Sequence, residues 1–168
     1  MKTALVSGLI LSALFSVSAH AALNAGDKAP DFNAQASLAG KAFNYSFKDA
    51  LKKGPVVVYF YPSAFTGGCN LQAHTFAEKS DRFAALGATV IGVSLDSIGR
   101  LNAFSADPEY CAGKVAVASD PDGKIARSFD LSVADTPSGR KDTRGADIDH
   151  GRVDRVTYVV GSDGKIAA

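Results

Sequence analysis

Two apolar runs dominate the middle of the chain. The first covers residues 56–61, directly after the break Gly54-Pro55, and the second covers residues 89–95. Runs of this length with little polar alternation are typical of strands buried on both faces of a sheet. We therefore predict two central strands at these positions.

Between the two runs, apolar and small residues recur every three or four positions. The recurring residues are Ala73, Phe76, Ala77, Ser80, Phe83 and Ala84. Charged residues fall on the opposite face, as in an amphipathic helix, and Gly87 is a typical C-terminal stop. We predict one helix over residues 69–86.

Shorter elements are predicted from the remaining apolar runs and turn signals. Strands are expected at residues 43–47, 115–118, 156–160 and from 165 onward. Helices are expected at residues 97–105 and 124–129, with a helical turn that starts at Ser46 or Asp49 and ends at Leu51. Residues 136–151 lack apolar periodicity and predict a long surface loop. The alternation of strands and helices indicates an α/β domain with a largely central sheet.

The N-terminal residues carry a different pattern. Residues 4–17 are mostly apolar, follow a basic residue and end shortly before Ala19 and Ala21. These features are typical of a secretory signal peptide. The alternative is a membrane anchor, but the run is shorter than the roughly 20 residues that span a bilayer. We predict a signal peptide over residues 1–21 and one exported domain over residues 22–168, which is periplasmic if the source is Gram-negative and secreted otherwise.

The balance of basic and acidic side chains bears on whether the protein binds nucleic acid or a membrane surface. The chain has 18 basic and 17 acidic side chains, and Lys2 lies in the predicted signal peptide, so removal of that peptide leaves equal numbers of the two. A net charge near zero gives no indication of a nucleic-acid partner or of an acidic membrane surface.

Two cysteines, Cys69 and Cys111, lie in the predicted exported domain. An even number in an oxidising compartment indicates a disulfide, which is either a structural staple or a working redox pair. Cys69 follows a Pro/Gly-rich loop at the start of the predicted helix. Free backbone N–H groups and the helix dipole favour a thiolate there, which points to redox or acyl chemistry.

Four motifs stand in order along the chain. They are Gly-Asp-Lys-Ala-Pro-Asp-Phe at residues 26–32, a Pro–x–x–x–Thr–x–x–Cys pattern at Pro62, Thr66 and Cys69, the amide of Gln72, and Arg-Val-Thr-Tyr-Val-Val at residues 155–160. In these motifs the chain resembles the peroxiredoxins, the alkyl hydroperoxide reductase/thiol-specific antioxidant family. The resemblance covers about residues 26–166 and implies a thioredoxin-like fold, with a central mixed β-sheet flanked by helices.

The resemblance implies a thiol-dependent peroxidase that reduces hydrogen peroxide and organic hydroperoxides. Cys69 is the expected nucleophile, and the first product is its sulfenic acid. Thr66 would accept a hydrogen bond from the hydroperoxide and position the sulfur. Arg155 would stabilise the thiolate and donate to the peroxide oxygens, because a guanidinium stays charged at any working pH. Pro62 would shield the sulfur from water. Neither an organic cofactor nor a metal is implied.

Cys111 is the expected source of the second thiol. It follows the predicted helix 97–105, near the place where some peroxiredoxin branches keep a resolving cysteine. The resemblance therefore implies an intramolecular Cys69–Cys111 disulfide that a thioredoxin-like dithiol reduces. The alternative is an unpaired Cys111 and a mechanism with one cysteine.

The chain departs from the family pattern in three places. Asn70 stands where the family usually has Thr, and His74 stands where the PrxQ-like branch often has its second cysteine. The sequence stops at Ala168, where relatives usually continue through a strand and a final helix, so we expect a truncated or unusually short domain. His74 and His150 have no partner pattern and are expected to be structural or exposed.

Two other functions remain open from the sequence. One is a thiol–disulfide oxidoreductase or electron carrier on the same fold, which is disfavoured because Gln72 stands where such proteins have a second cysteine. The other is a non-catalytic redoxin-like sensor or binding protein. The sequence is compatible with a monomer and with a homodimer.

Overall fold

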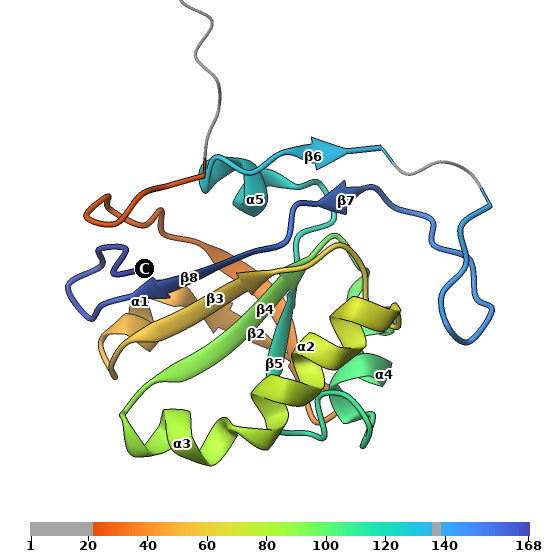
Figure 1. Ribbon diagram of the computed structural model, residues 1–168, viewed down its shortest axis with the longest axis horizontal. Coiled ribbons are helices and arrows are strands. Elements are labelled where there is room, and N and C mark those ends of the chain that lie inside the picture. The colour runs from red at the N-terminus through yellow and green to blue at the C-terminus, as the bar shows by residue number, and fades with distance from the viewer. Residues whose placement is uncertain (1–21, 136–138) are drawn as a thin grey trace, which may run out of the picture.

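A six-stranded mixed sheet forms the centre of the computed structural model, which describes residues 22–135 and 139–168 (Figure 1). In sheet order the strands are β2 (Lys41–Ser46), β1 (Asn33–Leu38), β5 (Ala116–Ser119), β4 (Thr89–Ser94), β3 (Val56–Phe60) and β8 (Val156–Val160). β3, β4 and β5 run parallel, whereas β8, β1 and β2 are antiparallel to their neighbours. A separate two-stranded ribbon pairs β6 (Val133–Ala134) with β7 (Arg152–Val153). The predicted signal peptide lies outside the described residues.

Helices cover both faces of this sheet. They are α1 (Phe47–Leu51), α2 (Gly67–Glu78), α3 (Ser80–Ala85), α4 (Ile98–Ala106) and α5 (Lys124–Ser128). None of the helices in the described part of the chain is long and apolar enough to cross a membrane.

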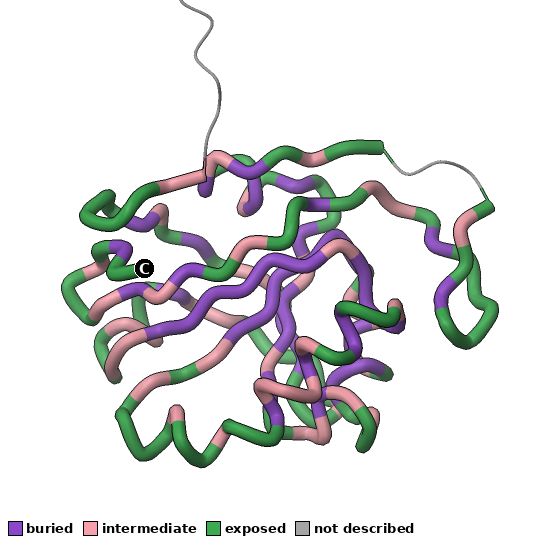
Figure 2. The backbone as a smooth tube through the Cα atoms, in the orientation of Figure 1, coloured by how far each residue is buried: buried purple, intermediate pink, exposed green. Residues whose placement is uncertain are grey.

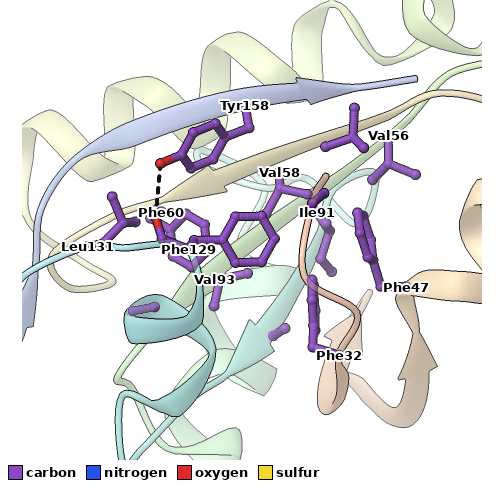
Figure 3. Close-up of a cluster of buried hydrophobic side chains, with 14 of the residues drawn as sticks. Phe32, Phe47, Val56, Val58, Phe60, Ile91, Val93, Phe129, Leu131 and Tyr158 are labelled. Carbon is purple, nitrogen blue, oxygen red and sulfur yellow. Dashed lines mark hydrogen bonds between the residues drawn. The ribbon is translucent and has the colours of Figure 1, made fainter. Parts of the chain in front are cut away.

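β3 separates two apolar cores because its side chains alternate between the faces of the sheet. Val56, Val58 and Phe60 join the first core with residues of α1, α5 and β8 (Figure 3). There the Tyr158 hydroxyl donates a hydrogen bond to the carbonyl of Phe129, at 3.2 Å. Residue Tyr59 points to the second core, which α2 and α4 cover.

The two predicted central strands are confirmed. β3 is buried along its whole length, as Figure 2 shows, and β4 is buried over its C-terminal half. The thioredoxin-like fold class and the mixed central sheet are also as predicted. The predicted helical turn is α1, and the hydroxyl of Ser46 accepts a hydrogen bond from the backbone N–H of Asp49.

The single helix predicted over residues 69–86 is wrong. The structure has α2 and α3 instead, separated at Lys79, whose φ of −96° and ψ of 5° leave the α-helical path. No residue of α3 is fully buried, and the half-buried Phe83 contacts the ring of Phe76 at the edge of the second core, with ring centroids 5.8 Å apart.

Two further differences concern strands at the edges of the fold. β1 was not predicted from its polar sequence. The strand predicted from Lys165 onward is present only as isolated bridges, one from Lys165 to Lys28 and one from Ile166 to Val160. The predicted loop 136–151 contains no helix or strand in its described residues, 139–151, while 136–138 lie outside them.

Candidate active site

Cys69 lies in the first turn of α2 with only 1% of its surface exposed. The buried strand β3 ends at Phe60, and residues 61–66, which we call the active-site loop, then lead to the helix. Thr66 occupies the N-cap position, but its side chain does not cap the helix. Its hydroxyl donates to the carbonyl of Ser63 at 2.8 Å instead. The oxygen of Thr66 therefore keeps its lone pairs free to accept a hydrogen bond.

The guanidinium of Arg155 lies against the sulfur of Cys69. Its Nη2 is 3.1 Å from Sγ, and its Nη1 donates to Oε1 of Gln72 and, at 3.4 Å, to the carbonyl of Gly68. Arg155 directly precedes β8, whose first residue Val156 pairs with the last residue of β3. The sheet register therefore brings a permanent positive charge to the N-terminus of α2, beside the sulfur.

The structure thus places Arg155 against Cys69, with Thr66 at the N-cap of the helix that carries Cys69. Pro62 is half-buried at the start of the same loop. Gln72 supports the arginine from the next turn of α2 and does not itself bond the sulfur.

Cys111 lies in the turns after α4 and is fully buried. It belongs to the same apolar core as Cys69, and both are free thiols. Burial, together with the negative charge of Asp107, raises the pKa of Cys111 to about 12. In this buried position the thiol of Cys111 is therefore protonated near neutral pH.

The turn that carries Cys111 is joined to α2. Nδ1 of His74 forms a hydrogen bond with the carbonyl of Glu109 at 2.9 Å. The ring of Tyr110 packs against Phe65, with ring centroids 5.8 Å apart. His74 is therefore a structural contact between the segments that carry the two cysteines.

Sequence reasoning missed a buried polar network behind the active-site loop. Its centre is Asp96, which follows β4 and is fully buried. Its carboxylate accepts hydrogen bonds from the N–H of Ala64 at 2.8 Å and the hydroxyl of Ser94 at 2.7 Å. It also contacts Nε2 of His150 at 2.9 Å and Nε of Arg100 at 2.8 Å.

The pKa values of Asp96 and His150 shift in opposite directions. Burial opposes ionisation of Asp96, but the hydrogen bond and charge of His150, together with the hydrogen bonds from Ala64 and Ser94, outweigh it and lower the pKa of the carboxyl. Burial likewise opposes protonation of His150, yet the hydrogen bond and charge of Asp96 raise the pKa of the imidazole. The sequence signal that could have revealed the network is the pair of polar residues, Ser94 and Asp96, at the end of a buried strand. The sequence around His150 contained no such signal.

The fold and the site together define a class: a thioredoxin-like α/β protein with a buried cysteine at a helix N-terminus and an arginine on its sulfur. The sequence matches the AhpC/TSA family over residues 25–168. Peroxiredoxin Bcp of Escherichia coli is 31% identical over 144 residues, which cover 86% of this chain and 83% of that protein. A putative peroxiredoxin of Mycobacterium tuberculosis is 33% identical over 144 residues, covering 86% and 82%. The chain therefore belongs to the AhpC/TSA family of peroxiredoxins.

Other relatives match over a smaller share of their length. A chloroplastic 2-Cys peroxiredoxin of Hordeum vulgare is 30% identical over 114 residues, and the match covers 66% of this chain but 54% of that protein. The chain thus spans about half the length of the chloroplastic relatives that it matches.

Solved structures agree with this assignment. The crystal structure of peroxidoxin BcpB from Mycobacterium tuberculosis has a TM-score of 0.67 and 27% identity, covering 84% of this chain and 81% of that one. A PrxQ mutant of Xylella fastidiosa has a TM-score of 0.69 at 22% identity, covering 88% and 85%, and it supports the fold alone.

Proposed function

We propose that the protein is a thiol-dependent peroxidase that reduces hydrogen peroxide and organic hydroperoxides at Cys69. The observation that carries this proposal is the contact of 3.1 Å between Nη2 of Arg155 and Sγ of Cys69. A peroxidase needs a thiolate together with fixed donors for the oxygen that leaves, and one guanidinium at this position supplies both.

The first step follows from the positions of these groups. The Cys69 thiolate attacks one peroxide oxygen, the O–O bond breaks, and an S–O bond forms. The second oxygen leaves with the electron pair, takes up a proton and becomes water or an alcohol. The proton of the Thr66 hydroxyl is committed to the carbonyl of Ser63, so its oxygen accepts from the O–H of the hydroperoxide. The product on the enzyme is a sulfenic acid.

The second step in this proposal uses Cys111. Its thiolate attacks the sulfur of the sulfenic acid, a disulfide forms, and hydroxide leaves and is protonated to water. Membership of both cysteines in one apolar core supports this pairing. An external dithiol of the thioredoxin type then reduces the disulfide and restores both thiols.

Export is part of the same proposal. Residues 1–21 would direct the chain out of the cytoplasm, and cleavage after Ala21 would release the domain. N-terminal sequencing of the protein recovered from its native host tests this: a mature chain that starts at Ala22 supports export, and one that starts at Met1 contradicts it.

The peroxidase proposal is tested by the second-order rate constant for oxidation of Cys69 by hydrogen peroxide. We expect a value at least about a thousandfold above that of free cysteine at neutral pH, because preorganised donors contribute effects of this size. Cys111→Ser should keep this first oxidation and accumulate sulfenic acid, whereas Cys69→Ser should abolish it. A wild-type rate equal to that of free cysteine would contradict the proposal.

A further inference from the structure

Phe65, the residue directly before Thr66, has a left-handed backbone conformation with φ of 60°. A bulky non-glycine residue in this region costs roughly 1–3 kcal/mol and persists only where surrounding contacts hold it. The side chain of Phe65 is almost fully buried, so the position is also fixed by packing. The loop that leads into the active site therefore contains a strained residue, and its neighbours must supply the restraint.

Three residues distant in sequence hold the backbone of Ala64 and Phe65. The carboxylate of Asp96 accepts from the N–H of Ala64 at 2.8 Å, and Nη2 of Arg100 donates to the carbonyl of Ala64 at 3.0 Å. The carbonyl of Phe65 accepts two hydrogen bonds from Thr143, one from its N–H at 2.8 Å and one from its hydroxyl at 2.9 Å.

Asp142 fixes the turn that presents Thr143. Its side chain is fully buried and accepts hydrogen bonds from Nη2 of Arg100 at 2.7 Å and Nη2 of Arg144 at 2.8 Å. It also accepts from the N–H groups of Arg144 and Ala146, at 2.8 and 3.0 Å. Burial opposes ionisation of this carboxyl, but these donors lower the pKa of Asp142, so it remains anionic. A buried carboxylate with this many donors is a firmly held anchor.

Arg144 adds a contact on the ring of Phe65. Its guanidinium carbon lies 3.2 Å from the ring centroid, so the turn at residues 142–146 covers the side chain whose carbonyl Thr143 binds. The turn at residues 142–146 therefore contacts both the backbone and the side chain of Phe65.

We infer that Asp142 and Thr143 are positioning residues, which brace the left-handed backbone of Phe65 and thereby set Thr66 and the first turn of α2 for attack on peroxide. The inference rests on the proposed peroxidase function. Neither residue touches the sulfur; they act through the carbonyl of Phe65. A displacement of about 1 Å at a reacting group can lower a rate about a hundredfold, so a brace at this position governs catalysis without taking part in it.

The test compares two substitutions at one position in the full chain. Thr143→Val keeps the shape and the backbone N–H but removes the hydroxyl donor, whereas Thr143→Ser keeps the donor. Asp142→Asn removes the anchoring charge and is a second, independent way to loosen the turn. Lys141→Gln is the matched control, because its side chain forms an exposed ion pair with Asp147 and a hydrogen bond of 3.4 Å to the carbonyl of Gly145, and neither partner lies in the active-site loop.

Two quantities are measured for each variant. The first is the rate constant for oxidation of Cys69 by hydrogen peroxide. We expect this rate constant to fall about 10-fold or more in Thr143→Val and Asp142→Asn. In Thr143→Ser and Lys141→Gln it should stay within about twofold of wild type. The second is amide hydrogen exchange of residues 64–70, which we expect to accelerate about fivefold or more in the first two variants only.

The outcomes separate this inference from the proposed function. If the wild type reacts no faster than free cysteine, the peroxidase proposal fails, and hydrogen exchange alone decides whether the brace exists. If the wild type is fast and folded Thr143→Val and Asp142→Asn match it in both measurements, the inference is overturned. Faster exchange with an unchanged oxidation rate also overturns it, because the brace would then be structural only.

Discussion

Gly68 sets how closely the arginine approaches the sulfur. A Cβ added at Gly68 would lie 3.3 Å from Nη2 of Arg155, whereas a Cβ added at Gly67 would meet nothing within 4 Å. Both glycines lie in the first turn of α2 and neither has a positive φ, so alanine fits the backbone at each. The two positions differ in their distance from the guanidinium and in little else.

We predict that Gly68→Ala slows oxidation of Cys69 about threefold to tenfold, because the new methyl group displaces the guanidinium by a few tenths of an ångström. Gly67→Ala should leave the rate unchanged. Both variants should be at least as stable as the wild type, since alanine favours a helix over glycine. Stopped-flow oxidation kinetics and thermal unfolding of the pair check this, and equal rates for the two variants would contradict it.

At the scale of elements, the proposed resolution of the sulfenic acid by Cys111 would require the turn after α4 to open. Cys111 is fully buried, and its pKa of about 12 leaves very little thiolate near neutral pH. Once the turn opens to water, the pKa of the thiol returns toward about 8.5, the value of an exposed cysteine. Opening therefore supplies the thiolate as well as the freedom to reach Cys69.

We predict that His74→Ala speeds formation of the Cys69–Cys111 disulfide about fivefold, because it removes the hydrogen bond from α2 to the carbonyl of Glu109. Glu78→Gln is the control, since it removes only the contact of 3.4 Å between Glu78 and Nε2 of His74 within α2. Thiol titration after one equivalent of peroxide follows the reaction.

The pH profile of the same reaction provides a second check. If the turn opens first, the rate rises with pH and levels off near 8.5. A rate that keeps rising toward pH 12, together with no acceleration in His74→Ala, would show that the closed turn reacts directly.

The sequence predicted those elements whose patterns are local. β3 and β4 were predicted because an apolar run needs no partner to be recognised. β1 was missed because its residues are mostly polar and small, and it becomes a strand through pairing with β2 and β5. The break at Lys79 was missed because Phe83 and Ala84 continue the apolar period of α2, although no residue of α3 is fully buried.

At the scale of the whole molecule, the active site and its support differ in how far they could be predicted. Cys69 and Thr66 stand in one short motif, and Arg155 stands in a second one at the start of a recognisable strand. Thr143, by contrast, lies 78 residues from Phe65 in a polar loop, and no local pattern indicates which backbone carbonyl it binds. Sequence patterns therefore predicted the candidate reacting groups, whereas the contact of Thr143 with the loop before them is visible only in the fold.

The Asp96–His150 pair makes global stability depend on pH. The two residues are 54 positions apart, and their side chains are 0% and 11% exposed, so their interaction is lost when the chain unfolds. Burial lowers the pKa of His150, but the interaction with Asp96 opposes this effect, and the pKa lies above its ordinary value of 6.5. This contribution to stability is fully present below pH 6.5 and is lost as the pH rises through the higher pKa of the folded state.

Asp96 acts in the opposite sense. Its pKa is lowered from 3.8, so its contribution to stability is present above pH 3.8 and is lost as the pH falls through the lower pKa of the folded state.

We predict that the free energy of unfolding declines as the pH rises from about 6 to 8.5, and that His150→Gln flattens this decline. Glutamine keeps a hydrogen-bond donor for Asp96 but carries no proton that titrates in this range. The variant should therefore be destabilised most at pH 6, and the gap to the wild type should narrow toward pH 8.5. Urea unfolding followed by circular dichroism at several pH values measures the gap. Parallel curves for the two proteins would mean that the imidazole is not charged in the folded state, and Arg100 would then supply the positive charge that balances Asp96.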